Sequence, residues 1–317
     1  MKKKILIILT IAIAIGGRGY GIGNYFVSYA LSPTSDSDQR EISSEDAIEL
    51  ESHTKQQIEK NKEIEKQKGI QFSKKTQETS LQSQDHFTLK AKYKTQDTHE
   101  WVILIHGYKS NNENMMSYGE TYYQKGYNVL LPNNRAHGNS EGHYIGMGWL
   151  DKEDIALWVD WIVNRDKEAK IIIHGVSMGG ATTMMISGDN LDHVVGYVED
   201  CGYTSVWDIF ASELDKRFSL PTFPVLDVSN LVANIKAGYD FKKASSLKQV
   251  KLTQKPMLFI HGGQDDFVPT DMVYEVYGAS QSIKDLYIAD QAGHAESKDY
   301  DPQAYWNKVF SFIDKNI

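Results

Sequence analysis

The sequence has 317 residues, which is long for one compact domain but short for two large ones. Its formal net charge of −8 argues against nucleic acid as the main partner, because binding phosphates requires a basic face. The single cysteine, Cys201, excludes an internal disulfide, so the fold must be stabilised by its core.

The first 31 residues are typical of a segment that directs a protein to a membrane. Three lysines, Lys2–Lys4, precede an apolar run over Ile5–Ile15, and apolar and aromatic residues recur as far as Leu31. A charged start before an apolar run indicates an export signal, and about 20 apolar residues can span a bilayer. We expect a signal anchor over residues 1–31, with the lysines in the cytoplasm and the enzyme domain on the extracellular side of the cell membrane. Cleavage at Ser28–Ala30, which would release a secreted enzyme, is the alternative.

Two further features before residue 70 concern helix packing. Gly17 and Gly21, and also Gly19 and Gly23, have the spacing that lets two membrane helices approach closely, but we expect that these glycines are merely tolerated. Residues 32–69 begin as a polar linker and become rich in Glu, Lys and Gln after Ser43. This composition predicts a charged, solvated helical spacer that has no partner and stops at Gly69.

From residue 70 onward, short β-branched runs alternate with amphipathic stretches. The predicted strands cover residues 86–94, 101–105, 127–131, 170–173, 194–198, 256–260 and 285–289. The predicted helices lie around residues 115–122, over 151–165 and 178–187, and from Asp301 onward. This alternation predicts an α/β protein with a mostly parallel central sheet and helices on both faces. Functional sites in such sheets lie at the carboxyl ends of the strands.

One motif lies at such a strand end. Residues 175–179 read G-V-S-M-G and match G-x-S-x-G, directly after an apolar strand and directly before a helix. This is the setting of a nucleophile elbow, in which a serine occupies a tight, strained turn. The glycines have a physical reason, because only residues without side chains let the strand and the helix approach so closely. Ser177 is therefore the candidate nucleophile.

A serine hydroxyl is a weak nucleophile unless a base accepts its proton. The loop after strand 256–260 contains Asp265, and the loop after the last strand ends in His294. Both loops leave the carboxyl ends of strands and can meet Ser177 there, so His294 is the candidate base. The other histidines next to strand ends are expected to have structural roles: His106, His137, His174 and His261.

The body of the chain, residues 70–317, resembles the α/β-hydrolase superfamily, whose catalytic residues follow the order serine, acid, histidine. Residues 134–140, N-R-A-H-G-N-S, are similar to the family's R-G-H-G-x-S loop, with Ala136 where glycine is usual. Within the superfamily the chain resembles N-terminally anchored bacterial cell-surface hydrolases, related to serine-aminopeptidase-like and acyl-thioester-hydrolase-like branches. The resemblance implies that Asp265 holds the acid position of H-G-x-x-D-x-x-V-P. Asp200, at a strand end where some members carry the acid, is the alternative, or else bonds within the Cys201–Thr204 turn.

An oxyanion hole is expected from two backbone N–H groups. One belongs to Met178, directly after the nucleophile, and the other to Tyr108, directly after His106-Gly107. One such donor is typically worth about 3 kcal/mol of transition-state stabilisation. This chemistry requires no metal and no cofactor, and the sequence contains neither an H-E-x-x-H zinc motif nor a phosphate-binding P-loop.

A long insertion at about residues 203–255 lies where the superfamily usually carries a cap. Trp207, Phe210 and Leu214 form a helical apolar stripe, which is followed by Phe218, Leu220 and Phe223. These side chains either line an apolar acyl pocket or pack the helix onto the body. We slightly favour packing for the stripe and leave the choice open for Phe218–Phe223. A pocket would imply esters or thioesters with apolar acyl groups, including lipids.

Three functions remain in competition. The first is a membrane-tethered serine esterase acting on small-molecule or lipid esters, which we prefer. The second is a peptidase or amidase that uses the same residues, and the third is a catalytically silent surface binding module. The presence of Ser177, Asp265 and His294 together argues against the third.

Overall fold

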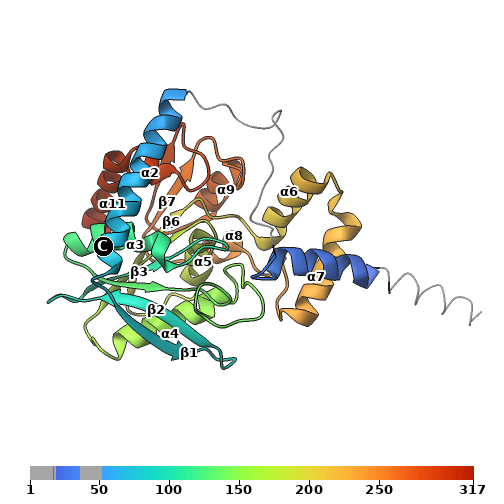
Figure 1. The fold of residues 1–317 in the computed structure, drawn as a ribbon, viewed down its shortest axis with the longest axis horizontal. Helices are drawn as coiled ribbons and strands as arrows, with labels where there is room; N and C mark the ends of the chain where they lie inside the picture. Colours follow the sequence, from blue (N-terminus) through green and yellow to red (C-terminus); the bar gives the residue numbers. More distant parts are fainter. Residues whose placement is uncertain (1–16, 18, 36–51) are drawn as a thin grey trace, which may run out of the picture.

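The computed structural model describes residues 17, 19–35 and 52–317 of the chain. Its centre is an eight-stranded sheet with the strand order β1-β2-β4-β3-β5-β6-β7-β8 (Figure 1). The first two strands pair antiparallel, and β3 to β8 pair in parallel, so the predicted mostly parallel sheet is confirmed. The strands are β1 (Gln77–Gln82), β2 (Thr88–Lys94), β3 (Glu100–Ile105), β4 (Asn128–Pro132), β5 (Lys170–Val176), β6 (Val194–Asp200), β7 (Met257–Gly262) and β8 (Lys284–Ala289).

Helices cover both faces of this sheet. Successive residues of a strand point to opposite sides, so each strand contributes apolar side chains to both faces. In β3, Trp101, Ile103 and Ile105 pack in one apolar cluster with α4 and α9, whereas Val102 and Leu104 pack in a second with α3 and α11. Burial on both faces explains why the strands read as continuous apolar runs. The helices of the body are η1 (Asn112–Met115), α3 (Met116–Gln124), α4 (Asp151–Val163), α5 (Met178–Ser187), α9 (Asp271–Ala279), α10 (Ser297–Tyr300) and α11 (Pro302–Asn316).

The helix before the body differs from its prediction. Helix α2 (Ser52–Ser73) continues past Gly69, where a Cβ atom would lie 3.3 Å from Met116 Cβ, so this glycine marks a close crossing with α3. The prediction of a solvated helix without a partner over residues 32–69 is also wrong, because Ile58 is only 1% exposed. Just beyond that range, Phe72 is buried against the body. Glu65 is buried as well and is paired at 3.0 Å with the ammonium of Lys298 in α10.

The insertion between β6 and β7 forms a helical cap beside the sheet (Figure 1). Its helices are α6 (Val206–Phe218), α7 (Thr222–Lys236) and α8 (Ser246–Gln249). Residues 19–31 form another helix, called the N-terminal helix below, which lies against this cap. No described helix is both long and apolar enough to cross a membrane. The apolar run Ile5–Ile15 of the predicted anchor falls outside the described residues.

Candidate active site

Ser177 occupies a strained turn between β5 and α5. Its φ of +58° lies in the left-handed region, which a residue with a side chain rarely adopts. A Cβ atom at Gly179 would lie only 2.1 Å from the carbonyl oxygen of Ile105, which is why the motif needs glycine there. The backbone N–H of Ser177 donates to the carbonyl oxygen of Asp200 at 2.8 Å. These contacts fix the hydroxyl at the carboxyl edge of the sheet.

The structure brings Ser177, His294 and Asp265 together in a continuous chain of hydrogen bonds. Nε2 of His294 lies 2.8 Å from Oγ of Ser177, and Nδ1 lies 2.8 Å from Oδ2 of Asp265. An ionised carboxylate can only accept, so Nδ1 carries the imidazole proton. The lone pair of Nε2 is then left to accept the proton of the serine hydroxyl. This geometry prepares Ser177 for attack.

The surroundings of Asp265 keep its carboxyl group ionised. Its Oδ1 accepts from the backbone N–H groups of Phe267 at 3.0 Å and Val268 at 2.9 Å. Burial alone would raise the pKa of Asp265, but its hydrogen bonds and electrostatic interactions with His294 and His261 outweigh burial and hold the pKa well below the usual range. A carboxylate that stays charged continuously orients the imidazole.

Asp200, the alternative acid, bonds elsewhere. Its Oδ2 accepts from the hydroxyl of Tyr305 at 3.0 Å, and burial raises the pKa of Asp200 to about 6. Asp200 was also expected to bond within the Cys201–Thr204 turn. In the structure Glu199 fills that role, because its carboxylate accepts from the Gly202 N–H at 3.0 Å. The two neighbouring strand ends therefore present two carboxylates, of which Asp265 bonds His294.

A buried polar chain extends from Asp200 beneath the sheet edge. The hydroxyl of Tyr305 donates a hydrogen bond to Asp200. The same hydroxyl lies 3.0 Å from Nε2 of His174, where it acts as the acceptor for the Nε2–H group. Nδ1 of His174 is then the acceptor for the Tyr122 hydroxyl, 3.1 Å away. Burial lowers the pKa of His174 to about 3, so this imidazole is neutral in the folded protein.

The neutral His174 makes a testable contribution to acid sensitivity. Below pH 6.5 the unfolded chain protonates this imidazole and the folded chain does not, so stability is complete above pH 6.5 and falls toward pH 3. We expect wild type to lose about 2 kcal/mol more unfolding free energy than His174→Gln between pH 7.5 and pH 5. Urea unfolding of both proteins at both pH values measures this difference. The contribution of Asp200 largely cancels, because wild type and His174→Gln both contain it. Equal losses in the two proteins would contradict it.

The other strand-end histidines are buried and have structural partners, as expected. His106 Nε2 accepts from the Asn134 N–H at 3.0 Å, and His137 Nε2 accepts from the Lys109 N–H at 3.0 Å. Burial lowers the pKa of His106 to about 3 and that of His137 to about 4. These imidazoles join the loop after β3 to the loop after β4. In the second loop Ala136 has a φ of +58°, which explains why related loops favour glycine there.

The two expected oxyanion donors lie beside Ser177. Met178 begins α5, and the first N–H groups of a helix have no acceptor within the helix. The loop that carries Tyr108 passes close by, since a Cβ atom at Gly107 would lie 3.3 Å from Ser177 Cβ. Tyr108, Met178 and Ser177 all line one cavity. The side chain of Tyr108 has its own partner, because its hydroxyl donates to the Ala30 carbonyl oxygen at 2.6 Å.

The cavity beside Ser177 has an empty volume of about 810 Å³, which includes space open to solvent. Its largely apolar lining includes Phe210, Leu214 and Phe218 of the cap. Phe210 and Leu214 also pack in the apolar cluster that contains Met178, so the predicted packing of the stripe is confirmed and the stripe lines the cavity as well. The pocket interpretation is wrong for Phe223, whose side chain is 76% exposed.

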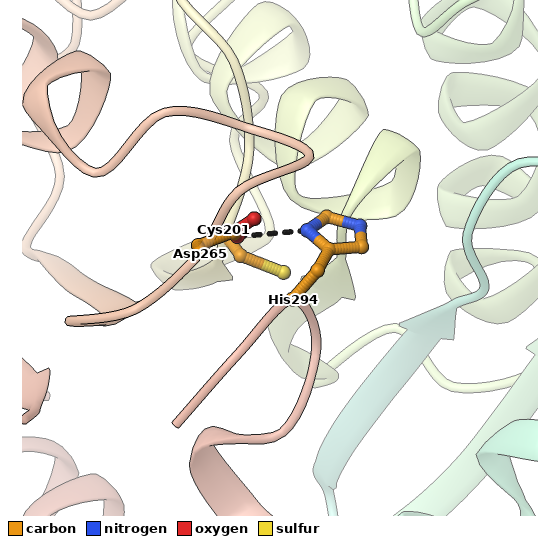
Figure 2. A group of neighbouring side chains, drawn as sticks. All are labelled: Cys201, Asp265 and His294. Carbon is orange, nitrogen blue, oxygen red and sulfur yellow. Dashed lines mark hydrogen bonds and ion pairs between the residues drawn. The ribbon is translucent and has the colours of Figure 1, made fainter. Parts of the chain in front are cut away.

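Cys201 lies next to Asp265 and His294 (Figure 2). Potential ligand atoms of the three side chains fall within 4.8 Å of one another, which raises the question of a metal site. Burial raises the pKa of Cys201 well above its usual value and keeps the thiol protonated, whereas metals bind the thiolate. Both imidazole nitrogens of His294 already have partners. The donor set therefore suits proton transfer better than metal binding.

Comparison with known proteins matches this chain to hydrolases. Residues 96–228 match the family model described as "Serine aminopeptidase, S33". The chain is 30% identical over 220 residues to the uncharacterized protein YqkD of Bacillus subtilis, covering 69% of this chain and 72% of that relative. It is 23% identical over 245 residues to a thermostable monoacylglycerol lipase of Bacillus sp. strain H-257, covering 68% and 90%. The Pyrococcus furiosus esterase Pf2001 superposes with a TM-score of 0.64 at 23% identity, covering 76% and 92%.

The fold and the matches to related proteins together define a hydrolase of the α/β-hydrolase superfamily, and the predicted fold class is confirmed. Within that superfamily, the chain belongs to the serine aminopeptidase S33 family and has esterases and lipases among its relatives.

Proposed function

We propose that the protein cleaves carboxylic ester or thioester bonds through an acyl-enzyme formed on Ser177, with His294 as base and Asp265 orienting the base. The observation that carries this proposal is the hydrogen-bonded chain from Asp265 through His294 to Ser177, which ends in an apolar cavity. No cofactor enters the reaction. The protein is then a carboxylesterase-like or lipase-like enzyme.

In each half of the proposed cycle, His294 first accepts a proton and then gives it up again. Ser177 Oγ attacks the carbonyl carbon while its proton passes to Nε2 of His294, and the N–H groups of Met178 and Tyr108 bind the resulting oxyanion. The imidazolium then gives this proton to the departing alcohol or thiol as the bond to the acyl carbon breaks. Water releases the acyl group by the same steps in the second half. Throughout the cycle the ionised Asp265 stabilises the imidazolium.

The cavity favours an apolar acyl group over a peptide. Its walls are mainly aromatic and aliphatic, and a relative of the chain is named a monoacylglycerol lipase. The description of the family as serine aminopeptidases supports peptide or amide cleavage as the second candidate. The same serine chemistry acts on both bond types, so substrates must distinguish the two.

A panel of p-nitrophenyl esters with acyl chains from acetyl to dodecanoyl, assayed beside aminoacyl p-nitroanilides, tests this choice. We expect kcat/KM to rise by up to about fourfold per added methylene until the cavity is filled, because each buried methylene is worth about 0.8 kcal/mol. We expect the anilides to be poor substrates. Turnover of anilides alone would establish the peptidase instead.

We also propose that the protein is held at the cell membrane by the part of its N-terminal segment that precedes residue 19, with the enzyme domain outside. Lys2–Lys4 and the apolar run Ile5–Ile15 support this proposal. Carbonate-washed membranes and protease treatment of intact cells test it. Full recovery of the protein in the cytosol, or in the medium after cleavage, would contradict the anchor.

A further inference from the structure

The N-terminal helix packs against the cap as part of the folded domain (Figure 1). Val27 is 1% exposed and Leu31 is 0% exposed, and both belong to the apolar cluster that contains Met178 and Leu226. Phe26 forms an edge-to-face pair with Phe218 of α6, with ring centroids 5.2 Å apart. This burial indicates that the helix is an integral part of the domain.

Polar contacts fix the end of this helix that lies near the site. The carbonyl oxygen of Leu31 accepts from the Ile145 N–H at 2.9 Å, and that of Ala30 accepts from the Tyr108 hydroxyl at 2.6 Å. The guanidinium of Arg217 in α6 donates to the Tyr29 hydroxyl at 3.1 Å. The helix is thus joined both to the cap and to the loop that carries an expected oxyanion donor.

A close helix crossing sets the distance between the N-terminal helix and α7. A Cβ atom at Gly23 would lie 2.8 Å from the carbonyl oxygen of Val228 and 2.9 Å from Cγ2 of Val232. A Cβ atom at Gly21 would meet nothing within 4 Å. The expectation that these glycines are merely tolerated is therefore wrong for Gly23, because any larger residue there would push the helix away from α7.

Four residues of the N-terminal helix line the same cavity as Ser177: Phe26, Val27, Tyr29 and Ala30. The remaining lining comes mostly from the cap and from the loops around Ser177. An acyl chain attached to Ser177 and extending into this cavity would contact the helix. Its residues would then decide how long a chain the cavity accepts.

We propose that residues 19–31 form a wall of the acyl-binding cavity, select the acyl chain length, and are retained in the mature enzyme. The inference rests on the proposed esterase function and identifies the substrates as esters whose acyl chain is long enough to reach this wall. Cleavage near Ser28–Ala30 would remove Phe26 and Val27 and open the cavity. Residues 19–31 of the predicted anchor would then serve substrate binding and would not span the bilayer.

Two full-length variants should change the chain-length preference in opposite directions. Ala30→Trp fills the cavity, so the ratio of kcat/KM for dodecanoyl to acetyl p-nitrophenyl ester should fall at least about tenfold, the equivalent of two lost methylene contacts. Val27→Ala enlarges the cavity, so the preferred chain should become longer. Ile22→Trp is the matched control, because Ile22 lies on the same helix with a side chain 48% exposed. We expect that control to keep the wild-type ratio.

The outcomes separate this inference from the proposed function. Suppose that wild type hydrolyses esters and that its chain-length profile is unchanged in Ala30→Trp, Val27→Ala and Ile22→Trp. This result would overturn the inference and leave the esterase function standing. Wild type that hydrolyses no ester and resists fluorophosphonate labelling would overturn both. Thermal unfolding of each variant shows whether a loss reflects misfolding, and Val27→Ala still tests the wall if Ala30→Trp does not fold. The intact mass of the active protein from membranes must include residues 19–31.

Discussion

Replacing Ser177 with alanine is expected to lower kcat for ester hydrolysis by at least about 10⁴-fold. The substitution removes the attacking oxygen and its 2.8 Å contact with His294, while the backbone N–H keeps its bond to the Asp200 carbonyl. The fold should therefore be retained. Initial rates with the best ester of the panel measure the effect, and thermal unfolding verifies that the variant is folded.

Ser282→Ala provides the matched control for this experiment. Ser282 lies between α9 and β8, where its hydroxyl bonds only Ser280 and the Ile283 carbonyl among the described contacts. We expect this variant to keep wild-type activity and to react with a fluorophosphonate probe, whereas Ser177→Ala should not react. Near-normal turnover by Ser177→Ala would refute the proposed mechanism and favour a different nucleophile.

The fold could be predicted because the strong signals are local. Buried parallel strands are apolar on both faces, so β3 to β7 stand out as short apolar runs. The sequence G-V-S-M-G marks a turn that only glycine-flanked residues can form. β1 was missed because its residues, Q-E-T-S-L-Q, form a largely exposed edge strand without an apolar run. Helix α9 was also not predicted, because it has only nine residues and its buried side chains are Met272, Val273 and Val276 alone.

The N-terminal helix could not be predicted for a different reason. Apolar residues such as Val27 and Leu31 are equally suited to facing lipid and to packing in a protein core. The sequence alone therefore cannot distinguish a membrane helix from a buried one here. The contacts with α6 and α7 join segments about two hundred residues apart and exist only in the folded chain. The cavity wall formed by Phe26, Val27, Tyr29 and Ala30 therefore has no local signal. The same holds for α2, whose burial depends on the crossing at Gly69.

The position of the acid also depended on tertiary structure. Asp200 ends β6, while Asp265 follows β7, and the two strands are neighbours in which Asp200 is paired with Ile260. Both carboxylates therefore reach the same edge of the sheet. Only side-chain geometry separates them, because Asp265 bonds His294 whereas Asp200 bonds Tyr305.

Asp265→Asn is expected to lower kcat by about 10³–10⁴-fold, whereas Asp200→Asn should lower it by no more than about tenfold. An asparagine amide at 265 donates to Nδ1 of His294, which moves the imidazole proton to Nε2 and leaves no acceptor for the Ser177 hydroxyl. The amide oxygen still accepts from the N–H groups of Phe267 and Val268, so the loop should keep its shape. At 200 an amide oxygen still accepts from Tyr305. Among the described contacts, neither of these two side chains bonds Ser177 Oγ or the imidazole of His294.

Rates of the two variants at saturating ester, measured side by side with their unfolding temperatures, decide between the acids. Loss of activity confined to Asp200→Asn would make Asp200 the acid and require His294 to reorient during the reaction. Equal, large losses of activity in both variants would mean that the hydrogen-bonded chain from Asp200 through Tyr305 also affects the orientation of the His294 imidazole. A further double variant, Asp200→Asn with Asp265→Asn, measures that coupling directly: losses that multiply indicate independent roles, and a double loss equal to that of Asp265→Asn alone indicates a shared one.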